Sequence, residues 1–263
     1  MTQISVLLPT RGRKSTLLTS VQGLLSKASS IEHLEILFAV DQDDTEGMPY
    51  FIQHVCPYIE QLKIQHKILV CPSWGYTELH KYLNLLAENA QGHWLFFWND
   101  DAVMNTDHWD QEIIKHNDQF KLLSVLTHNQ HPYSIFPIVP KQWYNIVGHL
   151  SQHSLNDAWL SQIAYMLDIF QRIDINVTHD RNDLTGNNND ATYRRRQILE
   201  GNPADPRDFN HDTARQQRLN DAAKLATWMQ GRGLDLSFFV SVCEGSQDPW
   251  VKARLNDPNH QLT

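Results

Sequence analysis

Two adjacent carboxylates, Asp100 and Asp101, are the residues whose type and position most clearly permit chemistry. They closely follow residues 94–98, five uninterrupted apolar residues that predict a strand buried on both faces. Neighbouring carboxylates repel each other, and a divalent cation would relieve this repulsion, because hard cations prefer oxygen ligands. The alternative is a strand-to-helix turn in which Asn99 and the two acids serve turn chemistry alone.

Polar residues also follow two earlier predicted strands, residues 4–8 and 34–40. Strands that alternate with helices of about a dozen residues predict βαβ units and a parallel sheet. The carboxyl ends of parallel strands share one edge. One group of side chains should therefore converge there: Thr10, Asp41, Asp43, Asp100 and Asp101. The alternative for the acidic run 41–44 is a solvated turn, and that is the preferred interpretation of Asp43 and Asp44.

Composition and charge describe an ordinary globular protein. The 263 residues are 41% hydrophobic and 20% charged, and the formal net charge is −8, which argues against non-specific binding to nucleic acid or anionic membranes. The sequence shows neither a signal-peptide pattern nor an apolar run of the roughly 20 residues that a transmembrane segment needs. Three widely spaced cysteines disfavour a disulfide framework or a zinc site. We therefore expect a cytoplasmic protein.

The rest of the chain divides at about residue 198. Apolar spacing predicts helices at 14–25, 74–90, 157–170 and 213–230, with another helix beginning near Asp107, and strands at 68–70, 122–126, 135–139 and 173–178. The Asn-rich residues 180–190 predict a loop, and 199–212, with two prolines, predict a linker or lid. Two parts are expected: a nucleotide-binding and catalytic domain over 1–198, and a linker with a helical C-terminal extension over 199–263.

Three segments, in order, resemble one family. Residues 4–13 (ISVLLPTRGR), 34–47 (LEILFAVDQDDTEG) and 75–104, which end in WLFFWNDDAVM, resemble nucleotide-sugar-dependent glycosyltransferases of the GT-A fold, a group with many bacterial and phage members. The motifs are short, but their order is that of the family, and the resemblance covers roughly residues 3–190. It implies an α/β, Rossmann-like fold with a mostly parallel sheet flanked by helices.

The resemblance implies a donor pocket at the first two strand ends. Pro9, Thr10 and Arg11 would line the nucleotide base and ribose. Asp41 would accept the ring N–H of uracil. Asn84, on the helix before the central strand, matches another position of the family's donor site.

The same resemblance implies a metal site of the DxD type. Asp101 would be the principal ligand of Mn²⁺ or Mg²⁺, and Asp100 would contact the ribose or a metal-bound water. The chain departs from the family pattern at two positions. Asn99 stands where the first acid is often Asp, and Leu83 stands where many members have Arg. Lys81 and Arg13 are the candidates to replace that arginine.

Asp157 is expected to be the catalytic base. The segment 154–169 resembles the family's acidic segment at a helix start that faces the acceptor, and in an inverting transferase this acid accepts the proton of the attacking hydroxyl. The alternative is structural, because Ser154 and Asp157 have the spacing of a capping box.

The resemblance also implies a third metal contact at His179, followed by a loop over 180–198 that would order over the donor. Within it, the basic run 193–196 (YRRR) would suit a pyrophosphate, and its alternative is a solvated helix face. Three other histidines are interpreted as surface residues: His128, His131 and His153.

Together these features predict a metal-dependent glycosyltransferase. It would transfer a sugar from a UDP-sugar to a glycan or another hydroxyl acceptor, with inversion. The alternatives are a GT-A-like domain that binds nucleotide or glycan with little turnover, and a nucleotidyltransferase. The latter would normally carry a Gly-rich, basic phosphate loop, whereas residues 9–14 contain one glycine, Gly12.

Overall fold

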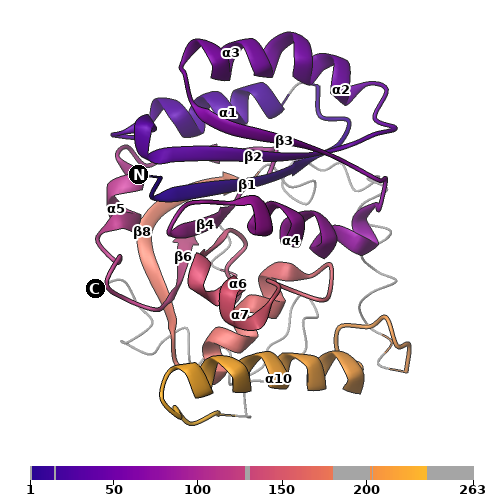
Figure 1. Ribbon diagram of the computed structural model, residues 1–263, viewed down its shortest axis with the longest axis vertical. Helices are drawn as coiled ribbons and strands as arrows, with labels where there is room; N and C mark the ends of the chain where they lie inside the picture. Colours follow the sequence, from indigo (N-terminus) through magenta and orange to yellow (C-terminus); the bar gives the residue numbers. More distant parts are fainter. Residues whose placement is uncertain (1, 15, 128–130, 180–201, 203, 236–263) are drawn as a thin grey trace.

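An eight-stranded sheet forms the centre of the computed structural model, which describes residues 2–14, 16–127, 131–179, 202 and 204–235 (Figure 1). The strands are β1 (Ile4–Thr10), β2 (Leu34–Asp41), β3 (Gln65–Cys71), β4 (Trp94–Phe97), β5 (Ala102–Met104), β6 (Leu122–Leu126), β7 (Pro137–Pro140) and β8 (Phe170–His179). Their spatial order is β3-β2-β1-β4-β7-β6-β8-β5. The predicted α/β fold with a mostly parallel sheet is confirmed.

Two strands run against the others. β7 pairs antiparallel with β4 and β6, and β5 pairs antiparallel with β8. The neighbours β1–β2, β2–β3, β1–β4 and β6–β8 are parallel. The three-residue strand β5 was not predicted. The helix predicted over 157–170 ends earlier, because Asp168 adopts a left-handed conformation (φ 54°) and the chain then enters β8.

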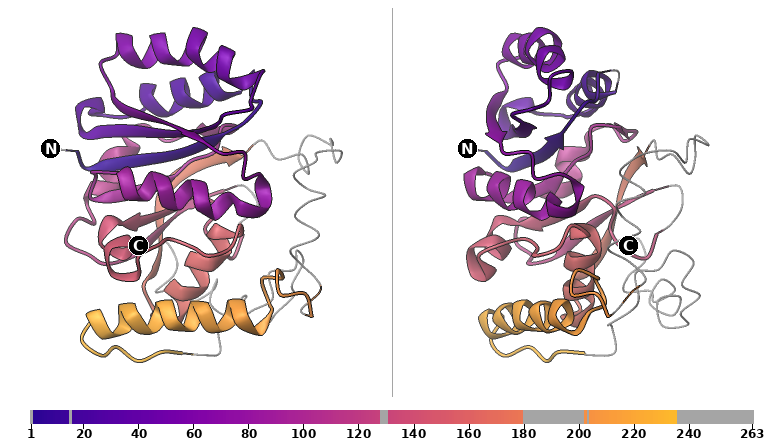
Figure 2. Two further views of the ribbon diagram at one scale, coloured as in Figure 1. Left: turned by 45° about the vertical axis from the view of Figure 1, so that its right-hand side comes forward. Right: turned by 90° about the vertical axis from the view of Figure 1, so that its right-hand side faces the viewer.

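Helices cover both faces of the sheet and divide the core into two clusters. One face carries α1 (Leu17–Ser26), the helical run α2 (Gly47–Tyr50), η2 (Phe51–Val55) and α3 (Cys56–Gln61), and also α5 (Trp109–Ile114). The opposite face carries α4 (Leu79–Asn89), α6 (Lys141–Val147) and α7 (Asn156–Met166) (Figure 2). Short 3₁₀ turns lie at Ile31–His33 (η1) and Tyr76–Glu78 (η3).

Helix α10 (Asp212–Trp228) lies along α6 and α7 on the side away from the sheet (Figures 1 and 2). Its buried residues Ala222, Leu225 and Ala226 belong to the same apolar cluster as α4, α6 and α7. The helix predicted over 213–230 is thus present, and its apolar face is part of that shared core. Within the described ranges, no helix is long and apolar enough to cross a membrane.

The buried carboxylate of Glu35 binds the backbone just before β4. This is the amino end of β4, whereas Asp100 follows its carboxyl end. Glu35 is 3% exposed, and its Oε1 accepts hydrogen bonds from the Ser5 hydroxyl (2.5 Å) and from the backbone N–H of Gln91 (2.5 Å) and Gly92 (3.2 Å). A Cβ on Gly92 would lie 2.6 Å from the backbone nitrogen of Ser5. β4 therefore approaches β1 at a distance that only glycine permits at this position.

Candidate active site

The carboxyl ends of β1, β2 and β4 meet as the parallel topology predicts. Thr10, the last residue of β1, donates its hydroxyl to Oδ2 of Asp100 over 2.8 Å. Arg11 pairs with Asp41 at the end of β2, with 2.7 Å between Nη1 and Oδ2. Side chains from three strands thus share one edge, which is where open α/β sheets bind ligands.

A second pair of strands brings Asp101 to His179. β5 and β8 pair so that Ala102 lies opposite His179, which places Asp101 beside the imidazole. Nε2 of His179 lies 3.2 Å from Oδ1 of Asp101 and 3.0 Å from the amide nitrogen of Asn99. The side chains of Asp101 and His179 are each 14% exposed. Residues 80 positions apart in the chain thus meet at one point.

These three side chains suit a divalent cation. Nε2 of His179 faces Oδ1 of Asp101 and the side-chain amide of Asn99. A 180° rotation of that amide would exchange its nitrogen for its oxygen, so that Asn99 could also offer an oxygen ligand. Nδ1 of His179 is buried and has no hydrogen-bond partner among the described residues. Carboxylate and amide oxygens bind Mg²⁺ or Mn²⁺, and an added imidazole favours the transition metal. In the described part of the chain, no three side chains of the types His, Cys, Asp and Glu are grouped for a metal. The candidate site has two of these types, Asp101 and His179, and Asn99 is its third member.

Asp100 is nearly enclosed, with 13% of its side chain exposed. Burial, together with the nearby charge of Asp101, raises the pKa of its carboxyl to about 7, although Arg13 and the Thr10 hydroxyl act in the opposite direction. Arg13 Nε lies 3.5 Å from Oδ1 of Asp100. Of the two candidates to replace the family's arginine, Arg13 lies in the site, whereas Lys81 pairs with Glu78 (2.7 Å) on the surface.

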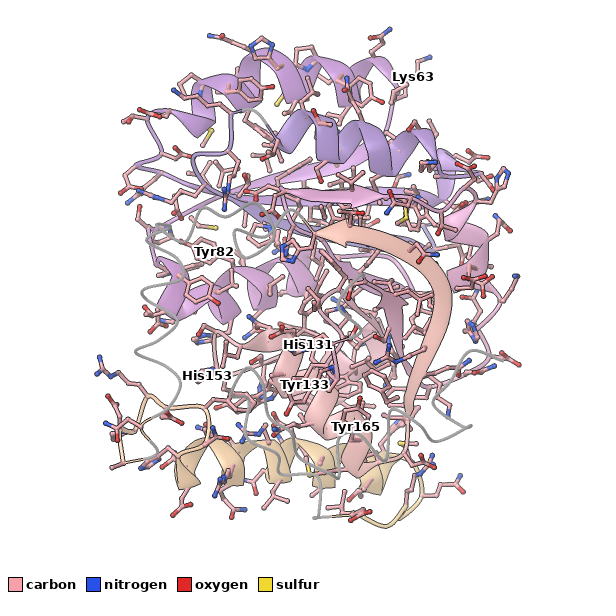
Figure 3. All side chains as sticks on the ribbon, turned by 180° about the vertical axis from the view of Figure 1, so that it is seen from behind. Lys63, Tyr82, His131, Tyr133, His153 and Tyr165 are labelled. Atoms are coloured by element: carbon pink, nitrogen blue, oxygen red, sulfur yellow. The ribbon has the colours of Figure 1, made fainter. Side chains whose placement is uncertain are left out.

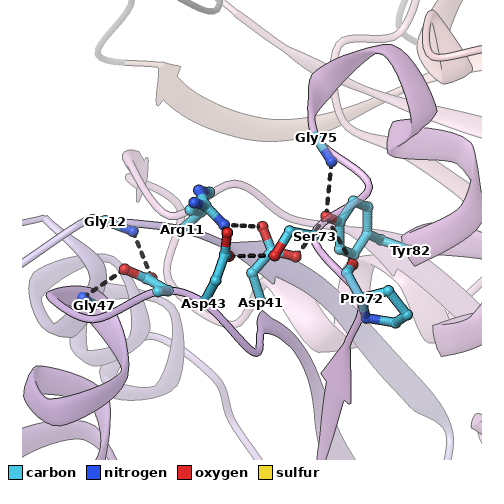
Figure 4. A network of polar contacts seen from close by, with 10 residues as sticks. Arg11, Gly12, Asp41, Asp43, Gly47, Pro72, Ser73, Gly75 and Tyr82 are labelled. Carbon is cyan, nitrogen blue, oxygen red and sulfur yellow. Dashed lines mark hydrogen bonds and ion pairs between the residues drawn. The ribbon is translucent and has the colours of Figure 1, made fainter.

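Arg11 is held between Asp41, the last residue of β2, and Asp43 in the turn that follows (Figure 4). The hydrogen bonds to Asp43 and Asp41 raise the pKa of its guanidinium further, and those from Arg11 and Ser73 lower the pKa of Asp43 to about 2. Asp41 is buried, and its other oxygen accepts the Tyr82 hydroxyl over 2.5 Å. Tyr82 was not predicted from the sequence, although a tyrosine among the apolar positions of an amphipathic helix needs a buried partner for its hydroxyl.

Asp44 is not a solvated turn residue, contrary to the preferred interpretation of this position. It is 7% exposed, and its two oxygens accept the backbone N–H of Gly47 and Gly12, each over 2.8 Å. Gly12 has a φ of 67°, a left-handed conformation that glycine adopts without strain. Asp44 thus ties the turn after β1 to the turn after β2. Asp43, by contrast, is exposed, and it pairs with Arg11.

Asn84 holds a loop. Its Oδ1 accepts the backbone N–H of Leu150, and its Nδ2 donates to the carbonyl of Ser151, both over 2.8 Å. The amide therefore joins α4 to the segment that leads into α7, and a nucleotide contact of Asn84 stays a prediction. Leu83 is buried in the core under α4. Pro9 is part of β1, opposite Ala39 in β2.

Asp157 lies in the first turn of α7, and its Oδ1 accepts the backbone N–H of Ala158 over 2.8 Å. The capping box considered for Ser154 and Asp157 does not form, because the helix begins one residue later, with Leu155 at the N-cap. The Ser154 hydroxyl is buried and has no hydrogen-bond partner among the described residues. The capping box with Ser154 is therefore absent, although Asp157 still accepts one backbone N–H of the first turn, and its catalytic role stays a prediction.

His153 is buried, not a surface histidine as predicted, and lies on the α10 side of the molecule (Figure 3). Nε2 faces the carbonyl of Arg207 at 3.0 Å, and Nδ1 accepts the backbone N–H of Leu155 at 3.1 Å. This arrangement fits the neutral ring with its hydrogen on Nε2. Burial lowers the pKa of His153 to about 4, and the charge of Arg218 contributes in the same direction.

Stability is expected to fall with acid because of His153. The ring has a pKa near 6.5 when unfolded and about 4 when folded, so the unfolded chain binds the proton first. The contribution is complete above pH 6.5 and decreases as the pH falls toward 4, by about 2 kcal/mol between pH 7.5 and 5. Urea unfolding at both pH values should show a smaller loss for His153→Gln than for the parent. His54→Gln, at an exposed position, serves as the control. An unchanged pH dependence in His153→Gln would contradict the assignment.

Several predicted features lie outside the described residues. These are the loop over 180–198 with its basic run 193–196, and His128. His131 is described: its Nδ1 accepts the backbone N–H of Tyr133 over 3.2 Å.

Comparisons with known proteins identify the family and the fold. The model of the family described as glycosyl transferase family 2 matches residues 5–196. No curated protein matches the chain significantly. Among solved structures, TarS 1–349 of S. aureus with UDP is 14% identical, with a TM-score of 0.52, over 70% of this chain and 62% of that fragment.

Two further structures are similar. The mannosyltransferase PcManGT from Pyrobaculum calidifontis, in complex with GDP-Man and Mn²⁺, is 12% identical with a TM-score of 0.56, over 87% of this chain and 75% of that one. GalNAc-T7 with UDP, GalNAc and Mn²⁺ is 11% identical with a TM-score of 0.54, over 67% and 43%. The chain thus spans less than two thirds of the TarS fragment and of GalNAc-T7. At these identities the likeness shows the fold, which is the predicted GT-A fold.

Proposed function

We propose that the chain, which belongs to glycosyl transferase family 2, is a glycosyltransferase that uses a UDP-sugar and a divalent cation, with Mn²⁺ favoured over Mg²⁺. The acceptor would be a glycan or another hydroxyl compound, and the transfer would invert the anomeric centre. The unpaired thiols of Cys56 and Cys71 suit a reducing compartment such as the cytoplasm.

One observation carries the proposal: Asp101, His179 and Asn99 meet beside the strand ends that carry Thr10 and Asp41. A cation there would have ligands from the chain on one side and diphosphate oxygens on the other, as in other sites that hold metal-bound phosphates. When bound, the cation neutralises charge on the diphosphate that leaves.

Side chains of the protein would bind the donor and transfer the proton. Asp41 accepts a base N–H, the turn that Asp44 fixes places Arg11, and Thr10 and Arg13 orient Asp100 toward the ribose. Asp157 would accept the proton of the acceptor hydroxyl. At the same time the acceptor oxygen bonds to the anomeric carbon of the sugar, and the bond from that carbon to the diphosphate breaks. TarS was solved with UDP and GalNAc-T7 with UDP and Mn²⁺, and these structures of the same fold support the proposed nucleotide donor and divalent metal.

Replacing Asp101 by asparagine is expected to reduce Mn²⁺-dependent UDP affinity at least tenfold. The change removes an anionic ligand and keeps the size of the side chain. Calorimetric titration of UDP with and without Mn²⁺ measures it, and a circular dichroism spectrum confirms the fold. Asp118→Asn, at an exposed position on the surface, is the matched control. Equal Mn²⁺-dependent affinities in the parent and in Asp101→Asn would refute the metal site.

A further inference from the structure

The hydroxyl of Tyr82 is fixed from several sides. It donates to Oδ1 of Asp41 over 2.5 Å and accepts the backbone N–H of Gly75 over 3.0 Å, while its ring contacts Trp74 edge-on, with the centroids 4.9 Å apart. Gly75 holds φ 74° and ψ −179°, a conformation that is essentially restricted to glycine. Figure 4 shows Tyr82 reaching from α4 to Asp41 at the end of β2.

This contact changes what Asp41 can recognise. Oδ1 is covered by the Tyr82 hydroxyl, and Tyr82 is 6% exposed. Oδ2 faces Arg11, whose side chain is 50% exposed. A carboxylate oxygen has two acceptor positions, so Oδ2 can take one further N–H beside that of Arg11. The side chain of Asp41 is itself 3% exposed, so an incoming base reaches Oδ2 only when the exposed side chain of Arg11 shifts, and it then meets one carboxylate oxygen with a guanidinium donor next to it.

We propose that Tyr82 determines base specificity: by occupying Oδ1 of Asp41 it selects a base edge with a single N–H beside a carbonyl and rejects one with two adjacent N–H donors. This inference rests on the proposed function, in which Asp41 meets the base. Uracil has the selected edge, with its ring N–H on Oδ2 and a carbonyl on Arg11. Guanine places an amino group beside its ring N–H, and that group would be buried without an acceptor.

Hypoxanthine provides a direct test, because it is guanine without the amino group. In the presence of Mn²⁺, the unaltered protein should bind IDP roughly fivefold or more tightly than GDP, the factor expected for one buried donor without a partner. The two nucleotides share the diphosphate and the purine ring, so metal and phosphate contacts cancel in the ratio. UDP should bind most tightly. CDP, with a ring nitrogen lone pair facing Oδ2, should bind weakly.

The variant Tyr82→Phe keeps the ring and frees Oδ1. It should reduce the preference for IDP over GDP to about one, and the ratio of GDP to UDP dissociation constants should fall severalfold. Tyr144→Phe, on α6 away from this site, is the matched control and should leave both ratios unchanged. A purely structural role of the Tyr82 hydroxyl would lower the melting temperature without altering either ratio, and that result would overturn the proposal.

Asp41→Asn separates this inference from the proposed function. If UDP binds the parent and Asp41→Asn weakens it at least tenfold, the donor site stands, and equal affinities of the parent for IDP and GDP would then overturn the role of Tyr82 alone. If Asp41→Asn leaves UDP affinity unchanged, the base does not meet Asp41 and the donor assignment itself fails. The IDP and GDP comparison uses the unaltered protein, so it holds even if Tyr82→Phe folds poorly.

Discussion

Asp157→Asn is expected to slow sugar transfer by a factor of about 10² to 10⁴, while the protein still folds and binds its donor. The asparagine has the size of the aspartate and retains an oxygen that can accept the N–H of Ala158. What it loses is the ability to accept a proton from the acceptor hydroxyl. Chemistry and stability are therefore separated in one substitution.

The measurement is single-turnover transfer from a UDP-sugar, with UDP affinity and melting temperature determined on the same preparation. Asp118→Asn should transfer at the parental rate. A near-parental rate in Asp157→Asn would remove this residue from the catalytic step. The anomeric configuration of the product gives an independent check, because a retaining reaction would not need a base at this position.

Gly92→Ala is expected to destabilise the fold by about 3 kcal/mol, a large part of the stability of a typical domain. The added methyl group would lie 2.6 Å from the backbone nitrogen of Ser5 and 2.9 Å from the carbonyl carbon of Ile4. Both atoms belong to β1, which is paired on both sides and cannot move away. The clash would also disturb the hydrogen bonds that Glu35 accepts from Gln91 and Gly92.

Urea unfolding provides the measurement, with Gly23→Ala as the matched control. Gly23 lies within α1, and no heavy atom lies within 4 Å of the position that its added methyl group would take, so the same substitution should stabilise there, by up to about 1 kcal/mol. Opposite signs for the two variants are the expected result. Equal unfolding midpoints for Gly92→Ala and the parent would show that β1 and β4 tolerate a wider spacing.

Much of the fold follows from local pattern. The apolar runs of β1, β2 and β4 are strands in the structure, and their polar ends meet because parallel strands share an edge. The strand predicted over 135–139 is present as β7, but its reversed direction and the strand β5 were not predictable in this way. β5 has three residues, too few for a periodic signal, and its direction depends on pairing with β8, more than 70 residues later.

In the candidate site, too, some residues were predictable from local pattern and others depend on distant partners. Asp41, Asp100 and Asp101 were identifiable because acids at the end of a buried strand conflict with their surroundings. Tyr82 and Asp44 were not, because each acts through a partner from another element: Tyr82 reaches β2 from α4, and Asp44 binds the backbone of the turn after β1. The sequence pattern of a helix face or of an acidic turn indicates burial and local geometry, but it does not identify the partner group on another element.

The pairing of β5 with β8 has a consequence for the order of events during synthesis. β5 carries Asp101 into the sheet, and its partner in the sheet is β8. A nascent chain that ends before Phe170 therefore contains all the acids of the strand ends but lacks the strand that holds Asp101 in place and the imidazole of His179. Such a chain lacks the proposed cation site, so the proposed metal binding would wait until most of the sheet has emerged from the ribosome.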